Sequence, residues 1–412
     1  MMEIDINKHR KNLQLLALVI IALISCLRAM IWILPSPLMG VISEDLDLTL
    51  SQGGMLMYIV TILMGAFLFF GSICVDRLGS WRAMALSIFC FIVDGVTAWF
   101  ATSYWVLMIG RVMSGVGYGL NTCALGVLVA ERFPPEKRLL ANGFCAAMNS
   151  VGVMLAYAVT IPLYDIMGES WRKLLLTWSA SALVLGIVYT LMESRLEKKG
   201  PQKEANPVKE KAKGKTGNSS LVVALRYRET RWTIFAMFGG MWLYTCFNTY
   251  LPTVLPELAG IDTATASTVA SLISAGGLIS CLCCAFLKGK CPAKGLMIGF
   301  CVLMCAGAFM SILLPMPALQ VGVFFTGFGF TAWATVIATV LMGTPGFTPE
   351  VYGAANALYY GTGSLFTILV PSVFEALAGG VGMKTTMLIF SALAIIPILG
   401  MAMYPNRDDL KV

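Results

Sequence analysis

Three ionisable residues interrupt long apolar stretches of this 412-residue chain: Arg28, Asp94 and Arg111. A charge in a low-dielectric surrounding is costly unless it is paired, so we expect Asp94 to be the counter-ion of Arg111. Two roles fit such a pair: a permanent bond that fixes two helices, or a bond that breaks when Asp94 takes up a proton. The only histidine, His9, lies too near the N-terminus to relay protons to this pair.

Arg28 then has no acidic partner within the apolar stretches. Its guanidinium presents a planar fork that matches a carboxylate or a phosphate, so the residue predicts a binding site for a small organic anion. An alternative is that Arg28 extends toward the surface or bonds backbone carbonyls near Pro35 and Pro37.

Further candidates for substrate contact are amides and aromatic rings in the apolar stretches. They are Trp32, Asn121, Asn149, Asn248 and Tyr359. Each could instead bridge two helices or anchor one at a membrane interface. The second half of the chain carries no base well inside its apolar stretches, which disfavours a dianion.

The elements that position these residues follow from composition. The chain is 58% hydrophobic and only 12% charged, whereas about a quarter of the residues of a soluble domain are charged. Apolar stretches of about 20 residues can cross a bilayer, and twelve are present. They are 13–35, 53–75, 83–102, 105–130, 139–164, 171–192, 231–256, 263–287, 295–315, 318–343, 351–377 and 383–404. The sequence therefore predicts an all-α membrane protein with twelve transmembrane helices.

The distribution of basic residues predicts the orientation. Most of the 29 Lys and Arg fall in the N-terminal segment, alternate loops and the C-terminus, whereas Arg172, Lys173 and Lys384 fall on the other side. The positive-inside rule then makes both termini cytoplasmic. We expect a multi-pass protein of a bacterial inner (plasma) membrane, in contact with lipid and monomeric. The net charge of +7 reflects these loops and does not indicate nucleic acid.

The chain is an internal duplication. "FPPEKRLLAN" from Phe133 matches "FTPEVYGAAN" from Phe347, and "GRVMSGVGYG" from Gly110 matches "GVFFTGFGFT" from Gly322. A polar segment, 193–219, separates the copies and cannot bury enough apolar surface to fold alone. We expect a first six-helix bundle over 1–192, a cytoplasmic linker over 193–229 and a second bundle over 230–412.

The loop "GSICVDRLGSWR" places a charged cluster between two apolar stretches that are joined closely. Gly71 would let another helix approach, and Gly79 would permit a tight turn. Asp76 can pair with a base or cap a helix. Arg77 and Arg82 could hold the loop to one face or simply satisfy the positive-inside rule.

On these residues the sequence resembles the major facilitator superfamily over nearly its whole length. The loop is similar to the family pattern G-x-x-x-D-R-x-G-R-[RK], with departures at Ser80 and Trp81, and "RVMSGVG" from Arg111 is similar to R-x-x-x-G-x-G. The resemblance implies two pseudo-symmetric six-helix bundles and secondary transport by alternating access. It also implies a cytoplasmic gate at the loop, and the pattern that begins at Arg111 is common in proton-coupled members of the family. Proton coupling by Asp94 and Arg111 then follows if protonation of Asp94 breaks their pair.

The leading expectation is a secondary transporter of a small carboxylate-type anion, by proton coupling or exchange. It needs no enzymatic activity, metal or cofactor. A proton-driven exporter of drugs or cations is the rival, although "ANGFCAAMNSVGVML" lacks the G-P-x-x-G-G pattern of such antiporters. A membrane-embedded receptor or enzyme is a third possibility, without a nucleophile-base pair to support it. Cys281, Cys283, Cys284 and Cys291 lack the spacing of a metal site.

Overall fold

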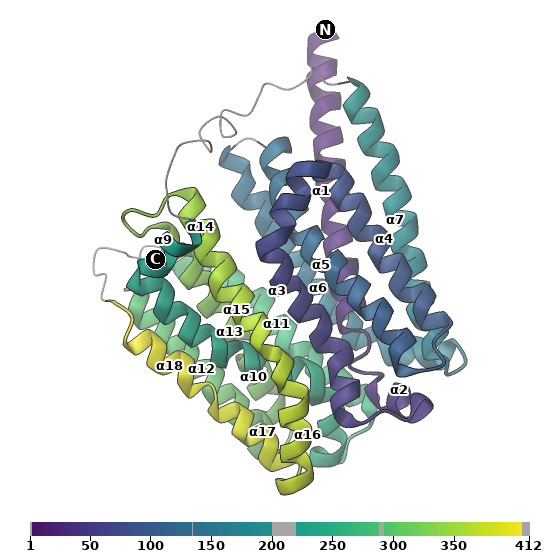
Figure 1. Cartoon of the computed structure of the whole chain (residues 1–412), viewed down its shortest axis with the longest axis vertical. Helices are drawn as coiled ribbons and strands as arrows, with labels where there is room; N and C mark the ends of the chain where they lie inside the picture. The colour runs from purple at the N-terminus through teal and green to yellow at the C-terminus, as the bar shows by residue number, and fades with distance from the viewer. Residues whose placement is uncertain (1, 134, 200–219, 288–291, 406–412) are drawn as a thin grey trace.

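The computed structural model describes residues 2–133, 135–199, 220–287 and 292–405, which form helices joined by short connections (Figure 1). The helices of the first half are α1 (Met2–Ile33), α2 (Met39–Leu46), α3 (Leu50–Leu78), α4 (Ser80–Trp99), α5 (Tyr104–Arg132), α6 (Pro135–Ile166) and α7 (Trp171–Lys199). Six of them are long, and the short α2 lies between α1 and α3.

The second half repeats this order after the undescribed residues 200–219, which make up most of the predicted linker. Its helices are α9 (Ser220–Arg226), α10 (Arg228–Ala259), α11 (Thr263–Leu287), α12 (Ala293–Leu313), α13 (Ala318–Met342), α14 (Pro349–Asn356), α15 (Thr362–Phe366), α16 (Val370–Val381), α17 (Met383–Ala392) and α18 (Ile395–Ala402). A π-helical turn, η1 (Ala357–Gly361), and a 3₁₀ turn, η2 (Thr367–Leu369), join α14, α15 and α16 into one nearly continuous rod.

Eleven helical segments of the described chain are long and apolar enough to cross a membrane. They correspond to eleven of the twelve predicted stretches, and 263–287 coincides with α11. The twelfth stretch, 231–256, lies inside α10, which has 32 residues and is therefore about 48 Å long. α10 is less apolar because it carries glycines, threonines and an asparagine that are buried against protein.

The internal duplication is visible in the helix packing. Gly115 of α5 packs against α3, and the matching Gly327 of α13 packs against α11. Gly117 of α5 packs against α4, and the matching Gly329 packs against α12. A Cβ atom at any of these positions would clash with the neighbouring helix. Glycine removes that clash and so permits the close helix approach that small residues provide in membranes. The two copies therefore use the same glycines for the same contacts.

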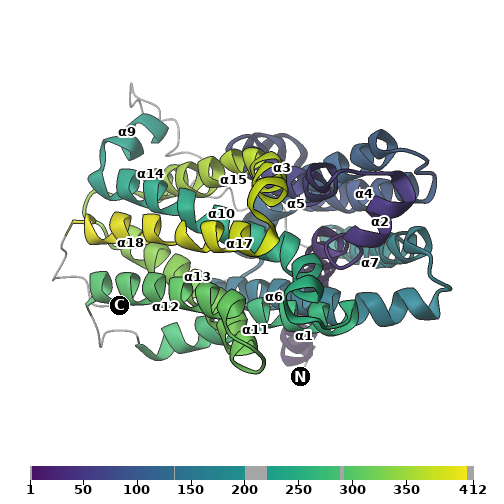
Figure 2. The ribbon, with the colours of Figure 1, turned by 90° about the horizontal axis from the view of Figure 1, so that it is seen from below.

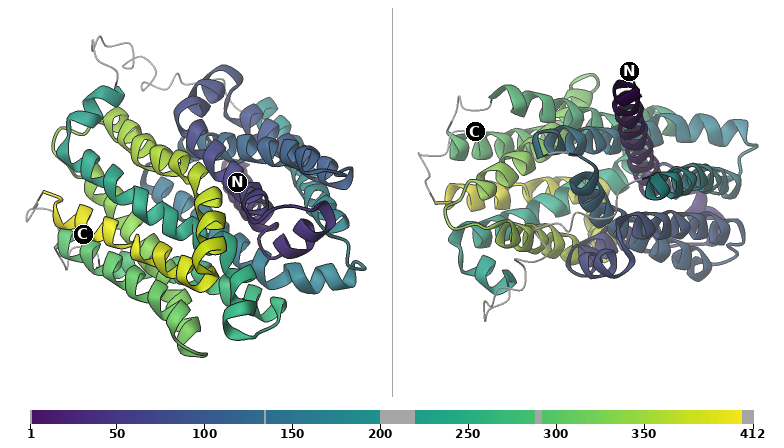
Figure 3. Two further views of the ribbon diagram at one scale, coloured as in Figure 1. Left: turned by 60° about the horizontal axis from the view of Figure 1, so that its bottom comes forward. Right: turned by 90° about the horizontal axis from the view of Figure 1, so that it is seen from above.

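The two halves lie side by side, with first-half helices running from purple to the teal of α7 and second-half helices running from green-teal to yellow (Figures 2 and 3). They meet where α6 packs on α11 and where α3 packs on the rod formed by α14 to α16. These contacts are related by the duplication, because α3 corresponds to α11 and α6 to the rod. In Figure 1 the halves converge near α2 and α16 and diverge toward the N-terminus and α9.

We call the end with α2 and the α16–α17 connection the distal face, and the end with the N-terminus the terminal face. Hydrogen bonds join the halves near the distal face. The hydroxyl of Ser36 donates to the backbone oxygens of Asn248 (2.8 Å) and Thr249 (2.9 Å). The Thr49 hydroxyl donates to the Glu375 carboxylate at 3.4 Å. The halves are thus closed on each other at the distal end.

The charged loop lies at the opposite, terminal face. Gly79 joins α3 to α4 with a φ of 86°, a conformation that a residue with a side chain rarely adopts. A Cβ on Gly71 would lie 2.7 Å from the Cys123 sulfur of α5, so this glycine allows close helix contact. Arg77 and Arg82 are exposed. The side chain of Asp76 lies outside the described residues, so its gating role stays a prediction.

Candidate functional site

Arg28 is the centre of a buried polar group between α1, α5 and α6. Its side chain is only 6% exposed. Nη1 donates to Asn121 Oδ1 and to Thr122 Oγ1, both at 3.0 Å, and Nη2 donates to Asn149 Oδ1 at 2.8 Å. All three acceptors are neutral, and no ion pair to Arg28 occurs in the described part of the chain. The positive charge is solvated by dipoles and is not neutralised.

Tyr118 of α5 covers the guanidinium. The Arg28 Cζ atom lies 4.3 Å from the centre of the ring, a cation–π arrangement. The Tyr118 hydroxyl donates to Asn149 Oδ1 at 3.1 Å, and Trp32 meets the ring edge-on at 5.8 Å. The structure therefore gathers four predicted residues, Arg28, Trp32, Asn121 and Asn149, around one ring.

Asn121 is held in the orientation that serves Arg28. Its Nδ2 donates to Ser87 Oγ of α4 at 3.1 Å, which leaves Oδ1 to accept from the guanidinium. The Ser87 hydroxyl donates in turn to the backbone oxygen of Met84 at 2.7 Å. This chain of bonds fixes the amide before any ligand binds.

Sequence reasoning missed Tyr118 and Thr122. Both lie on α5 with Asn121. Counted from Tyr118 as i, Asn121 is at i+3 and Thr122 at i+4, and such positions share one helix face. That spacing was the signal that could have identified them. Arg28 Nε has no hydrogen-bond partner among the described residues. A bound anion could accept from this atom and compete with the amides for the Nη atoms.

Asp94 and Arg111 form the predicted ion pair. Arg111 Nη1 lies 2.9 Å from Asp94 Oδ2, and the two residues are 0% and 2% exposed, respectively. The remaining donors of Arg111 reach backbone oxygens of Leu56 (2.9 Å), Ile31 (3.0 Å) and Trp32 (2.9 Å). Arg111 thus ties α5 to α1, α3 and α4.

Trp32 links the ion pair to the Arg28 group. Its backbone oxygen accepts from Arg111, and its ring contacts the Tyr118 ring that covers Arg28. Rearrangement of the Asp94–Arg111 pair would alter the hydrogen bond from Arg111 to the Trp32 backbone. It would thereby affect the contact of Trp32 with the Tyr118 ring above Arg28. The two sets of predicted residues are therefore neighbours that are joined through Trp32.

Asn248 and Tyr359 lie apart from the hydrogen bonds of Arg28. The backbone oxygen of Asn248 accepts from Ser36 and from the Tyr157 hydroxyl, and its Nδ2 donates to the Tyr244 backbone oxygen at 2.8 Å. Asn248 thus belongs to the distal junction of the halves. Tyr359 is fully buried in η1, with its ring 4.9 Å from that of Tyr360.

The second half contributes an aromatic surface near the group. The Tyr244 ring stacks on the Phe330 ring at 4.1 Å, with 10° between their planes. Tyr244 lies one turn before Asn248 on α10, and the backbone oxygen of Asn248 accepts from the Tyr157 hydroxyl of α6, the helix that carries Asn149. Tyr244 therefore lies near the boundary of the halves, beside the helix that provides one acceptor of Arg28.

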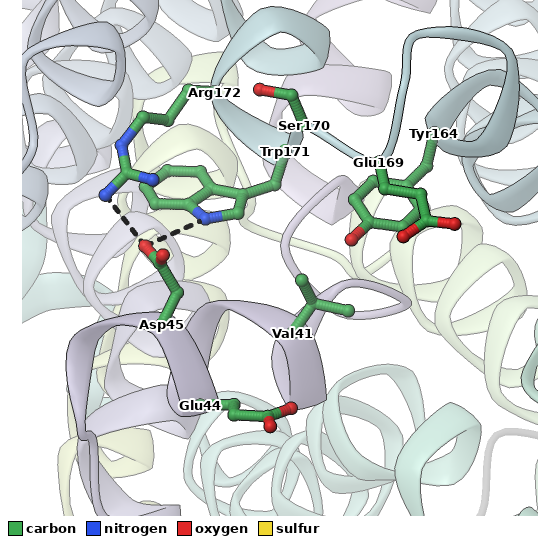
Figure 4. Close-up of a pocket in the computed structure, with 8 residues that line it drawn as sticks. All are labelled: Val41, Glu44, Asp45, Tyr164, Glu169, Ser170, Trp171 and Arg172. Carbon is green, nitrogen blue, oxygen red and sulfur yellow. Dashed lines mark hydrogen bonds and ion pairs between the residues drawn. The ribbon is translucent and has the colours of Figure 1, made fainter.

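A separate hollow of about 300 Å³ opens near α2 and the α6–α7 connection (Figure 4). Arg172 bonds the Asp45 carboxylate at 2.7 Å, and Trp171 Nε1 donates to the same carboxylate at 3.2 Å. Arg172 also donates to the Ala101 backbone oxygen at 2.8 Å. Because the charged pair is partly exposed, it contributes little stability. These bonds hold α2, α7 and the α4–α5 connection together.

Comparison with known proteins identifies the family to which this architecture belongs. Residues 21–371 match the family model described as Major Facilitator Superfamily. The chain is 23% identical over 288 residues to the hexuronate transporter of Bacillus subtilis, a match that covers 66% of this chain and 65% of that protein. It is 25% identical over 383 residues to a probable metabolite transport protein, CsbC, of the same species, covering 86% and 77%.

A solved structure supports the fold. A bacterial homologue of the human lysosomal transporter Spinster, in an inward-facing and unoccupied conformation, superposes with a TM-score of 0.74 at 14% sequence identity. The match covers 95% of this chain and 98% of that one. For the hexuronate transporter the match stays just under two thirds of its own length.

Proposed function

Since this chain belongs to the major facilitator superfamily, we propose that it is a secondary transporter of a small organic anion with a carboxylate group. The observation that carries the proposal is the buried charge of Arg28, which, within the described residues, is bonded only to neutral side chains. The similarity to a protein named as a hexuronate transporter also supports an anionic substrate.

The physical reason is the cost of a buried charge. Hydrogen bonds to neutral dipoles recover only part of the hydration free energy that a guanidinium loses on burial. A carboxylate supplies both the opposite charge and two oxygens with the spacing of the guanidinium fork. The same positive charge repels a cationic substrate, which disfavours the drug or cation exporter. We expect no catalytic activity, since substrate contact here needs only binding groups.

We propose that the halves, 1–192 and 230–412, rock about the bound anion. The bonds of Ser36 to Asn248 and of Thr49 to Glu375 close the distal face, and the halves diverge toward the terminal face (Figure 1). With both termini cytoplasmic, as the basic loops predict, this is an inward-facing state. The Asp76 loop would form its contacts in the opposite, outward-facing state.

Proton coupling through Asp94 is the finer part of the proposal. Protonation removes the charge that holds Arg111 Nη1 and leaves the guanidinium bonded to backbone oxygens of α1 and α3. Since Trp32 provides one of these oxygens and contacts Tyr118, protonation can move the ring above Arg28. An exchange mechanism would use the same site without this step.

The test is ligand stabilisation of the purified protein. Monocarboxylates should raise its melting temperature in a concentration-dependent way, because a ligand that binds only the folded state stabilises it. Organic cations should leave the melting temperature unchanged. Arg28→Gln should abolish the shift, whereas the exposed Arg82→Gln should retain it. Stabilisation of wild type by cations and by no carboxylate would overturn the proposal.

A further inference from the structure

We infer that the substrate is a monoanion with an uncharged ring, whose carboxylate binds Arg28 and whose ring lies on the aromatic surface around Tyr244. This inference rests on the proposed function and specifies the substrate class of the same site. It comes from a comparison of corresponding positions in the two halves. The glycine contacts between helices are shared, whereas the side chains at the positions of Arg28 and Asn121 differ in charge and size.

The correspondence follows from the glycines of α5 and α13. In the register that aligns Gly115 with Gly327, Tyr118 aligns with Phe330, and Asn121 aligns with Trp333. The structure supports this register, because the aromatic residue on the first helix of each half packs on the aligned ring. Trp32 packs on Tyr118 at 5.8 Å, and Tyr244 packs on Phe330 at 4.1 Å.

The same register aligns Arg28 with Gly240. A Cβ on Gly240 would lie 2.6 Å from the Cζ3 atom of Trp333, and Trp333 is 0% exposed. The indole therefore occupies the space beside Gly240 where the first half has a guanidinium bonded to Asn121. The duplicated site keeps one cation and replaces the other by a buried ring. One cation matches one carboxylate, and a second carboxylate would have no counter-charge there.

Tyr244 is the second-half counterpart of Trp32, the residue that contacts the Tyr118 ring above this cation. Its ring lies on Phe330, which contacts Trp333 edge-on at 6.0 Å. It is only partly buried, and it lies one turn before Asn248, whose backbone oxygen accepts from the Tyr157 hydroxyl of α6, the helix that carries Asn149 beside Arg28. An aromatic face binds the flat face of another ring or the C–H face of a sugar, and the phenol can bond a hydroxyl group.

The binding test compares four probes that separate the features of this substrate class. Acetate has one carboxylate and no ring, and succinate has two carboxylates. Benzoate adds a ring without hydroxyls, and glucuronate adds a ring with hydroxyls. We expect wild type to bind benzoate or glucuronate more tightly than acetate and succinate, and the preferred member of the first pair identifies the ring type. Succinate or acetate as the tightest ligand would overturn the inference.

Two variants locate the ring. Tyr244→Leu should weaken the preferred ring-bearing probe by about tenfold, in line with the energy of one aromatic contact, and should leave acetate within about twofold. Tyr164→Leu, a change at the distal hollow, is the matched control and should alter neither. Equal losses for acetate and the ring-bearing probe in Tyr244→Leu would refute the assignment of the ring to this surface.

A designed variant tests the charge argument independently. Gly240→Arg combined with Trp333→Asn rebuilds in the second half the pair that Arg28 and Asn121 form in the first. It should shift the preference toward succinate, and a preference that stays on the monoanion in a variant that still binds acetate would contradict the argument. If no anion binds wild type, the proposed function itself fails. If anions bind but the ring has no effect, only this inference fails.

Discussion

Replacement of Arg28 by lysine gives the sharpest prediction, because it keeps the charge and removes the geometry. In the structure the two Nη atoms reach acceptors on different helices, Asn121 and Thr122 on α5 and Asn149 on α6. A single ammonium nitrogen cannot hold both sides and also present two parallel donors to a carboxylate. The variant should therefore fold and retain a positive site but bind carboxylates weakly.

The magnitude follows from the number of bonds lost. A carboxylate on the guanidinium makes two charge-assisted hydrogen bonds, and lysine can replace only one of them. One such bond contributes about 1.5–3 kcal/mol, so the dissociation constant should rise roughly tenfold to a hundredfold. Isothermal titration of wild type and Arg28→Lys with the same monocarboxylate measures this ratio. Arg82→Lys, a change at an exposed arginine in the first turn of α4, is the control.

A dissociation constant for Arg28→Lys within about twofold of wild type would refute the reasoning. It would mean that Arg28 acts as a point charge or that the anion binds elsewhere. Only a modest fall in the melting temperature of the ligand-free variant is expected, because the lysine ammonium can keep some, but not all, of the neutral acceptors that Arg28 bonds. A large drop in that temperature would instead make Arg28 a structural residue.

Three further predictions concern coupling, gating and stability. Asp94→Asn should abolish uptake driven by a pH gradient while substrate exchange between liposome compartments survives; loss of both in a folded variant would contradict its coupling role. Asp76→Asn should raise the inward-open population and slow flux, which an unchanged ratio of crosslinks at the two faces would disprove. Hydrogen bonds from Thr265 to Asp262 lower the pKa of this carboxyl, so the cap it makes on α11 stabilises the folded state above the ordinary Asp pKa and is lost as pH falls through the lowered value. The destabilisation caused by Asp262→Ala should accordingly be smaller near about pH 3 than at neutral pH, as melting temperatures at the two pH values will show.

The membrane helices could be predicted from the sequence because their lengths are set by the bilayer. The stretch 263–287 coincides with α11, and 318–343 differs from α13 by one residue. α10 has no stretch as apolar as those of the other long helices that cross the membrane because glycines, prolines, threonines and Asn248 lower its mean hydropathy, and many of these residues are buried against protein. Burial of polar residues inside the bundle follows tertiary packing, which local hydropathy does not record.

The Asp94–Arg111 pair could be predicted from charge alone, because two buried ions of opposite sign attract each other strongly. Asn121 and Asn149 were expected to contact substrate or to bridge two helices, and their bonds to Arg28 could not be predicted from residue type. Tyr118 required attention to the helical spacing on α5. The place of Asn248 could not be predicted, because its bonds to Ser36 and Tyr157 depend on how the halves meet. Residue type does not specify that junction.

Counterflow in proteoliposomes tests the central claim most directly. Vesicles loaded with an unlabelled monocarboxylate are diluted into the labelled compound, with wild type, Arg28→Gln or no protein in the membrane. The account predicts transient accumulation of the label with wild type and none with Arg28→Gln, at equal protein content and without a pH gradient. Accumulation by Arg28→Gln at the wild-type rate, or counterflow by wild type of an organic cation and of no carboxylate, would contradict it.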